Sequence, residues 1–384
     1  MNEKDDRYAS IFLIFLRFGL LAWGGPVAQI AMIRDELVGR RQWITPEKFR
    51  RALAVYQALP GPEAHELCVY FGMIRAGRLG GFLAGLGFML PGLLLMLLLA
   101  WAYSFYGANV LLPLFVGVAP AVTAMIVRAA QRLGSHSLVS VGHWVAAIGA
   151  IGLTSMGVHF LMVFLIAAML QTLWSAGRRG AAIATALTFA VFAIYSTSFF
   201  PASNVINPGS SGNLLVEGLK AGLLSFGGAY TAIPFLQNSM VDHYPAITHT
   251  VFLDSIALGN VIPAPLIIFG TFLGYIAGGL SGALLMTFGI FFPAFAFTMI
   301  GHHQLERLIE NRAFHSALEG ISAAVVGLLA LTALDIFQQV VTGWPQLFLF
   351  AFSLSALIIL KSKWTIPAVI VGSGLIGYFL INAA

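Results

Sequence analysis

Two proline-flanked motifs in this chain could bind an anion. The ranges 60–62 (Pro-Gly-Pro) and 263–265 (Pro-Ala-Pro) each interrupt an apolar stretch with a helical pattern. Proline lacks a backbone donor and clashes with the preceding turn, so we expect each helix to break there. The half-helix that resumes at Pro62 or Pro265 presents N–H groups and a positive dipole end, which attract oxyanions. The motifs therefore predict a paired site for a tetrahedral dianion; two simple proline kinks are the alternative.

Two glycine pairs precede these motifs. Gly24-Gly25 is followed by Pro26, and Gly227-Gly228 stands at the corresponding place in the second half. Glycine permits positive φ and close backbone approach, at a cost of about 1 kcal/mol of helix stability relative to alanine. The alternative is tight helix packing through small residues, which is common in membranes. Because the first pair is joined to a proline and the pair recurs, we favour a broken helix that faces the substrate.

Four polar side chains flank the motifs. Arg17 and Lys220 each lie in a span just ahead of a glycine pair, where a cation is costly and indicates anion attraction. Snorkelling of these long side chains to the membrane interface is an equal alternative. Gln57 and Asn260 lie three residues before the first proline of each motif and could add neutral donors.

Carboxylates form a further group. Glu63 and Glu66, with His65 between them, follow the first motif, and Asp254 and Glu319 lie in the second half. Burial favours the protonated form of a carboxyl group, so these side chains could carry a coupling proton. Structural carboxylates that pair with a neighbour are the favoured alternative.

The residues predicted to bind the substrate are Arg17, Gly24, Gly25, Pro26, Gln57, Pro60, Gly61, Pro62, Glu63, Lys220, Gly227, Gly228, Asn260, Pro263, Ala264 and Pro265. No catalytic residue, metal site or cofactor is predicted. The histidines lack a metal-ligand spacing, and the single cysteine, Cys68, excludes an internal disulfide and a thiolate cluster.

The elements that position these residues occur twice. The glycine pairs and the proline motifs recur at a constant shift of 203 residues, as do Thr45 and Thr248. Two halves that keep helix-breaking residues in register, inside an apolar chain, are typical of transporters built from repeats. We expect a first repeat at 1–177, a linker helix and loop at 178–213, and a second repeat at 214–384.

The composition places the chain in a membrane. Hydrophobic residues make up 59% and charged residues 9% of the 384 residues, and the mean hydropathy is +0.89. A soluble domain carries about 25% charged residues, because water must wet its surface. Non-alternating apolar stretches of about 20 residues favour membrane-spanning helices over barrel strands. The formal charge of +5 reports which loops face the cytoplasm rather than nucleic-acid binding.

The predicted fold is all-α: a polytopic membrane protein with two six-span repeats of inverted topology and a linker helix near 180–199. Residues 47–76 and 250–276 each count as one discontinuous span. Most Lys and Arg residues then fall on the cytoplasmic side, as the positive-inside rule requires. The basic range 34–51 disagrees, because it would lie outside. The alternative makes 47–76 a re-entrant hairpin with an external N-terminus, and the halves are then parallel unless the linker span is dropped.

Several ordered motifs carry a family resemblance. They are 18–26 (Phe-Gly-Leu-Leu-Ala-Trp-Gly-Gly-Pro), 34–38 (Arg-Asp-Glu-Leu-Val), 57–64 (Gln-Ala-Leu-Pro-Gly-Pro-Glu-Ala), 226–228 (Phe-Gly-Gly) and Pro293. Together they resemble the chromate ion transporter family in its long, two-domain form, over essentially the whole chain. The resemblance implies a cytoplasmic-membrane protein with inverted halves that exports chromate and gives chromate resistance. The family commonly has Gln and Pro-Gly-Pro in the second repeat, where this chain has Asn260 and Pro-Ala-Pro; the departure bears on the substrate more than on the fold.

We therefore expect a multi-pass secondary transporter for a tetrahedral divalent oxyanion, in which the two halves rock to alternate access. Chromate follows from the resemblance, and sulfate would suit the same residues. The absence of a nucleotide-binding motif argues against direct ATP driving. An intramembrane enzyme would need a buried nucleophile or a metal cluster, and a structural scaffold would not explain the recurring prolines. The expected partners are the oxyanion and membrane lipid, without nucleic acid; a homodimer is compatible with the sequence.

Overall fold

A computed structural model of the chain describes residues 3–106, 108–199, 211–226, 228–241, 244–360, 362 and 364–382. Within these residues the chain is helical and forms no strand beyond an isolated bridge between Pro60 and Phe226. The all-α prediction is confirmed. The predicted linker loop at 201–213 lies mostly outside the described residues, because 200–210 are not among them.

The chain divides into two compact units. The first unit combines Met1–Met125, Asn207–His302 and Phe337–Ala384, and the second combines Ile126–Ile206 and His303–Ile336. Each unit takes segments from both predicted repeats, so the compact units are not the repeats themselves. The repeat boundaries at 1–177 and 214–384 remain a prediction.

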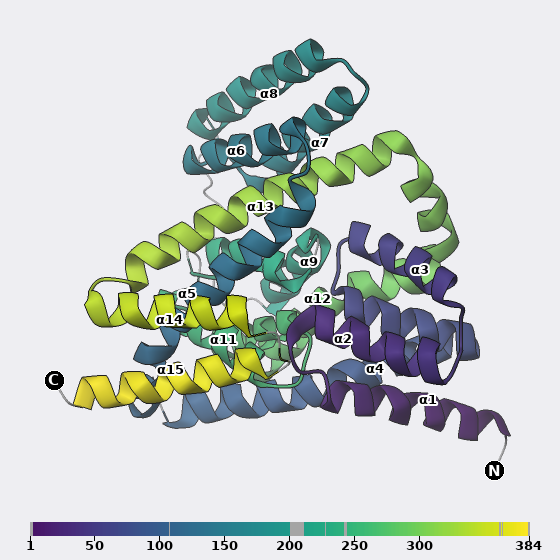
Figure 1. The fold of residues 1–384 in the computed structure, drawn as a ribbon, viewed down its shortest axis with the longest axis vertical. Helices are drawn as coiled ribbons and strands as arrows, with labels where there is room; N and C mark the ends of the chain where they lie inside the picture. Colours follow the sequence, from purple (N-terminus) through teal and green to yellow (C-terminus); the bar gives the residue numbers. More distant parts are fainter. Residues whose placement is uncertain are drawn as a thin grey trace. The chain divides into compact units, whose positions relative to one another are not determined.

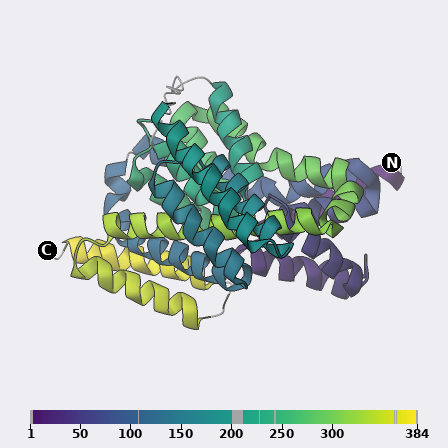
Figure 2. The same ribbon diagram turned by 90° about the horizontal axis from the view of Figure 1, so that it is seen from above.

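The first unit holds most of the helices (Figure 1). From the first half of the chain come α1 (Glu3–Leu20), α2 (Gly25–Arg34), the π-helix η1 (Asp35–Arg40), α3 (Pro46–Ala58), α4 (Glu63–Tyr106) and the start of α5 (Ala108–Ser137). From the second half come α9 (Ser211–Leu224), η2 (Ala229–Thr231), α10 (Ala232–Leu236), the π-helix η3 (Gln237–Val241), α11 (His249–Val261), η4 (Leu266–Ile268) and most of α12 (Phe269–Glu310). The last helices, α14 (Trp344–Ile359) and α15 (Thr365–Asn382), pack side by side (Figure 2).

The second unit contains α6 (Val141–Ser155), α7 (Phe160–Ser175), α8 (Arg179–Phe199) and most of α13 (Arg312–Val340). Helix α7 packs against both α6 and α8. The carboxyl oxygens of Glu319 on α13 lie 3.7 Å from His143 Nε2 and 3.2 Å from His315 Nε2. This carboxylate therefore has the structural pairing that the sequence left as its alternative interpretation.

Local backbone conformations of the first half recur in the second. Thr45 and Thr248 cap α3 and α11, each accepting a hydrogen bond of 3.2 Å from the backbone N–H three residues later. Helix α4 is interrupted at Ala76–Gly77, with φ of −147° and 65°, and α12 at Gly278–Gly279, with φ of −150° and 63°. A π-helix precedes the threonine cap in both halves. The sequence repeat is thus also a repeat of conformation.

Glycine lets the same helix pairs approach closely in both halves. A Cβ at Gly19 on α1 would collide with the carbonyl oxygen of Phe88 on α4, and a Cβ at Gly222 on α9 would collide with that of Ile290 on α12. Such small residues allow van der Waals packing between helices in lipid, where no hydrophobic effect drives association. This packing fixes α1 and α9 against the helices that follow the two breaks.

The two arms of the first broken helix lie side by side. Phe49 on α3 and Phe71 on α4 stack with ring centroids 6.3 Å apart, and Arg75 lies 5.8 Å from the ring centroid of Trp43. At a rise of 1.5 Å per residue, a through-going helix would separate Phe49 from Phe71 by roughly 25 Å or more. The chain therefore turns back at the break, and the hairpin alternative replaces the prediction that 47–76 is one discontinuous span.

The second broken helix folds back in the same way. Phe252 on α11 contacts Phe269 at the start of α12, with ring centroids 6.1 Å apart. A Cβ at Gly259 would also contact Phe269. The prediction of a discontinuous span at 250–276 is corrected in the same sense. We call residues 46–75 and 249–277 the first and second hairpins.

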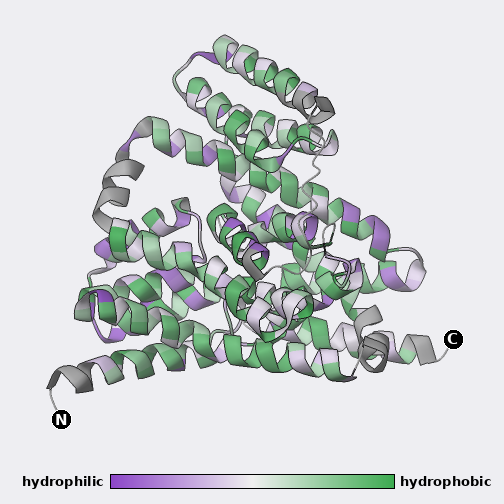
Figure 3. Cartoon of the chain, turned by 180° about the vertical axis from the view of Figure 1, so that it is seen from behind, coloured by the Kyte–Doolittle hydropathy of each residue, from purple (hydrophilic) through white to green (hydrophobic). Residues whose placement is uncertain are grey.

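Among the residues that the structure describes, three helices are long and apolar enough to cross a bilayer, by length and composition: Glu63–Tyr106, Leu266–Gly301 and Ala313–Val340. Six shorter apolar helices add to them: Tyr8–Leu20, Val141–Ser155, Phe160–Ser175, Arg179–Phe192, Trp344–Ile359 and Thr365–Phe379. Most of the helices consist largely of hydrophobic residues (Figure 3). These properties are those of an integral membrane protein. The predicted count of six spans per half treated each hairpin as one discontinuous span, so it is corrected together with that prediction.

Candidate functional site

Each break lies beside the glycine segment of the opposite half. At the first break, the Gly61 N–H donates to the Ser225 carbonyl oxygen at 3.0 Å, and Pro60 forms an antiparallel bridge with Phe226. Leu59, just before the break, is extended with ψ of 157°. The first hairpin turn is thus tied by backbone atoms to the segment that precedes η2.

A buried glutamine joins the second break to the first glycine segment. The side-chain amide of Gln29, 1% exposed, donates to the carbonyl oxygens of Ala22 and Ala264, both at 2.9 Å. Gly92 on α4 also lies so close to Ala264 that a Cβ there would collide. The two breaks and the two glycine segments therefore meet within the first unit, where the breaks and Gly228 are buried and Gly24–Pro26 are half-buried; we call this region the junction.

Gln29 was not predicted as a site residue. Its signal in the sequence was a lone amide in an apolar stretch, four residues after Gly25, where the second half has Ala232. A search for residues that recur would pass over it, because it does not recur.

Positive φ values mark the glycines of the junction. They are 90° at Gly24, 76° at Gly25, 147° at Gly61 and 117° at Gly228, a region that favours glycine. No atom lies within 4 Å of the place that a Cβ on Gly25 would occupy, so there is open space at the start of α2. Pro26 follows at the first turn of α2, where proline is favoured. Gly227, the other predicted glycine, lies outside the described residues.

Three ionisable side chains follow the first break. Glu66 is fully buried, and among the described residues neither of its carboxyl oxygens has a hydrogen-bond partner. A Cβ at Gly61 would lie 2.7 Å from Glu66 Oε1, so this carboxyl group folds back against the break. Glu63, 8% exposed, points toward Gly228 with its Oε1 3.9 Å from a Cβ built there. The His65 ring lies between aromatic rings, 4.9 Å from Phe291 and 4.7 Å from Phe295.

The predicted amide donors are not directed into the junction by any recorded contact. Gln57 is exposed at the end of α3. The Asn260 amide donates to the Ile256 carbonyl oxygen at 2.8 Å, and its oxygen accepts from the Tyr230 hydroxyl at 3.4 Å. Asn260 thus stabilises the end of α11 and its contact with η2.

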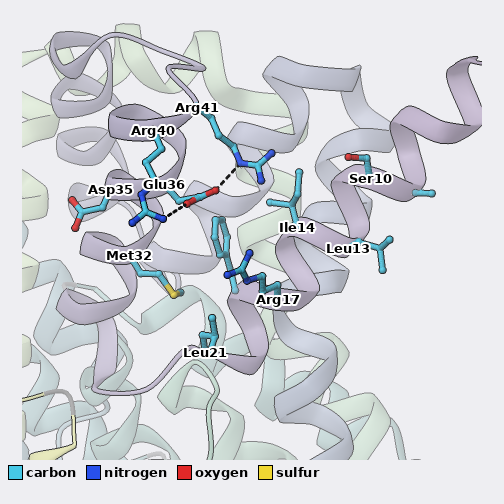
Figure 4. A pocket seen from close by; sticks show the side chains of 12 residues that line it. Ser10, Leu13, Ile14, Arg17, Leu21, Met32, Asp35, Glu36, Arg40 and Arg41 are labelled. Carbon is cyan, nitrogen blue, oxygen red and sulfur yellow. Dashed lines mark hydrogen bonds and ion pairs between the residues drawn. The ribbon is translucent and has the colours of Figure 1, made fainter.

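The two predicted cations differ. Lys220 forms an ion pair of 2.7 Å with Glu217, a carboxylate that is 3% exposed. Arg17 instead lines a pocket of about 630 Å³ between α1 and η1, opposite Glu36 (Figure 4). There Glu36 binds Arg41 at 2.8 Å and Arg40 at 3.6 Å, and the hydrogen bond from Arg41 holds the pKa of the Glu36 carboxyl below its usual range. No ion pair of Arg17 is recorded among the described residues.

Asp254 has a structural partner. It lies on α11, is 3% exposed, and accepts a hydrogen bond of 2.8 Å from the Tyr103 hydroxyl on α4. This contact links the second hairpin to the first long helix. The described residues contain no group of three His, Cys, Asp or Glu side chains that could hold a metal ion.

Comparison with known proteins identifies relatives along the whole chain. A family model described as chromate transporter matches residues 9–172 and 212–378. A chromate transport protein of Pseudomonas aeruginosa is 46% identical, over 97% of this chain and 92% of its own length. One from Cupriavidus metallidurans is 30% identical, over 96% of this chain and 92% of its own length. An uncharacterised transporter of Methanocaldococcus jannaschii is 27% identical over 99% of this chain and 96% of its own. No solved structure matches the chain.

Proposed function

The chain belongs to the chromate transporter family, and we propose that it is a secondary transporter that exports chromate across the cytoplasmic membrane and so gives chromate resistance. The observation that carries this proposal is the junction of two hairpin turns with two glycine segments. It supplies irregular backbone in a chain whose apolar helices otherwise satisfy their own polar groups. Such backbone is tolerated at membrane depth only where protein buries it or where it lines a cavity.

The chromate site is the junction. Helices α2 and α4 begin there, and the positive dipole end of a helix N-terminus favours an oxyanion. The open space beside Gly25 supports a ligand at the start of α2. Its walls come from Gly24–Pro26, Pro60–Glu63, Gly228 and Pro263–Pro265.

The flanking residues act indirectly. Arg17 attracts anions at the edge of the protein, in the pocket that it lines with Glu36 and Arg40. Lys220 is neutralised by Glu217, and Asn260 holds the end of α11. Gln57 is exposed at the end of α3, so its amide would donate to the anion only in a conformation that turns it toward the junction.

Transport proceeds by alternating access between two repeats of inverted topology. Because each hairpin returns to the side from which it starts, inversion requires that the linker helix α8 does not cross the membrane. The support is the recurrence of caps, kinks, π-helices and glycine contacts in the two halves. In transporters built this way, the substrate site lies near the bilayer midplane at interrupted helices, and the halves rock around it.

The membrane potential favours export of a dianion from a negative-inside cell. Moving each charge through 100 mV changes the free energy by about 2.3 kcal/mol, so two charges supply about 4.6 kcal/mol. Sulfate is the second candidate substrate, because it is also a tetrahedral dianion and the junction offers it the same donors.

The test is uptake of labelled chromate or sulfate by everted membrane vesicles that contain the protein. We expect chromate uptake that increases with an interior-positive potential, and no uptake by vesicles without the protein. If folded protein moves neither ion, the substrate assignment is wrong.

A further inference from the structure

The acidic turn after the first break has no counterpart in the second half. Glu63 and Glu66 lie in the first turns of α4, whereas the residues 203 positions later are Leu266 and Phe269. The junction is therefore chemically asymmetric although its backbone conformations recur. Two carboxyl groups in a site that binds an anion would repel the anion if they were ionised, so their presence needs an explanation.

Glu66 is the carboxyl group with the fewest compensating contacts. It is fully buried, its oxygens have no hydrogen-bond partner among the described residues, and it folds back against Gly61. An ionised carboxylate in such surroundings costs far more free energy than a neutral carboxyl group. In the arrangement that the structure shows, Glu66 is therefore protonated.

Titratable side chains lie on several elements that pack against α4. Those that the structure describes are Tyr8 and Arg17 of α1, Arg34 of α2, Glu47, Lys48, Arg50, Arg51 and Tyr56 of α3, His249 and Asp254 of α11, and Tyr275 of α12. On α4 itself, His65 is directed toward Phe291 and Phe295, and Glu63 precedes Glu66 by about one helical turn. Two ionised carboxylates at this spacing would repel each other.

We propose that Glu66 carries a proton that crosses the membrane together with the oxyanion. The proposal rests on the proposed function. A dianion at the junction is repelled by an ionised Glu66, so it binds after one carboxyl oxygen has taken a proton from water. Proton and anion thus favour each other's binding and move in the same direction. One net negative charge then crosses in each cycle, so a given membrane potential contributes half as much free energy to export as it does for the dianion alone. When the junction opens to the other side, the anion leaves and the O–H bond of Glu66 breaks, returning the proton to water.

The test uses the full-length protein in liposomes that contain a pH-sensitive dye and have their membrane potential clamped. With chromate added outside and no pH gradient, we expect chromate uptake to acidify the interior. Glu66→Gln mimics the protonated carboxyl group, so it should exchange chromate for chromate at the wild-type rate and lose the acidification. Glu47→Gln, an exposed carboxylate on α3, is the matched control and should behave as wild type.

Four results would overturn the proposal, and the first three concern acidification and exchange. They are chromate uptake by the wild type without acidification, acidification that persists in Glu66→Gln, and loss of chromate exchange in Glu66→Gln, which would make Glu66 a binding or structural residue. An interior that becomes alkaline during uptake would also overturn the proposal, because the dianion then enters without a proton and takes up protons inside. Failure of the wild type to move chromate at all would instead refute the proposed function, and with it the premise of the proposal.

Discussion

At the scale of single residues, the junction depends on the side-chain amide of Gln29 and on the backbone of Gly61. Gln29 uses both hydrogens of one amide to join Ala22 and Ala264, carbonyl groups from the two halves of the chain. Gly61 adopts φ of 147°, which leaves its N–H in line with Ser225 and its Cα against Glu66. These two residues hold the hairpin turns in place, and each leads to a stability prediction.

Replacement of Gln29 by alanine should destabilise the protein. Two buried carbonyl groups would lose their donor, and each unsatisfied buried group costs about 1–3 kcal/mol. We expect a lower midpoint of thermal unfolding in detergent. Gln57→Ala is the matched control, because Gln57 is exposed, and its midpoint should stay unchanged. Equal midpoints for the two variants would show that the Gln29 contacts contribute nothing.

Replacement of Gly61 by alanine should also destabilise the protein. The residue would have to keep a backbone conformation that costs about 1–3 kcal/mol for a side chain other than glycine, and its Cβ would crowd the Glu66 carboxyl group. Gly39→Ala is the control, since φ there is not positive and the nearest atom is 4.0 Å from a Cβ. Wild-type thermal stability of Gly61→Ala would contradict the assigned conformation.

At the scale of helices, the sequence predicted where the chain breaks but not the direction in which it continues. The Pro-Gly-Pro and Pro-Ala-Pro motifs give the ends of α3 and α11 at Ala58 and Val261. The local sequence does not determine the direction of the next helix, because after a proline break the chain can either continue or turn back. The contact between Phe49 and Phe71 joins residues from separate helices, and no periodicity within either helix reports it. Gln29 escaped prediction for the same reason, since its partner Ala264 lies 235 residues away in sequence.

The first hairpin predicts energetic coupling between its two arms. Phe49→Ala, Phe71→Ala and the double variant form a thermodynamic cycle, and aromatic pairs in contact couple by about 0.5–1.5 kcal/mol. The free energy of unfolding in mixed micelles gives the coupling. A matched cycle with Phe49 and Phe105, which lies far along α4, should give none. Strict additivity of Phe49 and Phe71 would favour the through-going helix.

The prolines of the breaks should matter for transport more than for folding. Pro60→Ala and Pro263→Ala each restore a backbone donor and permit the helix to extend by a turn, which would displace the start of the next half-helix from the junction. We expect normal insertion and impaired chromate uptake in everted vesicles. Wild-type uptake by both variants would reduce the breaks to ordinary kinks without a part in binding.

At the scale of the whole molecule, the repeat explains why one family model matches twice and why the chain contains paired hairpins. A duplicated unit of inverted topology places equivalent residues on opposite sides of the membrane, which is what alternating access requires. Composition predicted the membrane and the recurring motifs predicted the duplication. Orientation is harder to derive, because the basic range 34–51 conflicts with the other loops and because several apolar helices are shorter than a bilayer is thick.

Inversion can be tested at two equivalent, exposed positions. Arg78 follows the kink at Ala76–Gly77, and Leu280 follows the kink at Gly278–Gly279. Cysteines introduced singly at these positions, in a Cys68→Ala background that removes the buried native thiol, report the side that each faces. We expect a membrane-impermeant thiol reagent to modify Arg78→Cys only in everted vesicles and Leu280→Cys only in intact cells. Modification of both from the same side would mean parallel halves, and rocking of inverted repeats could not then be the mechanism.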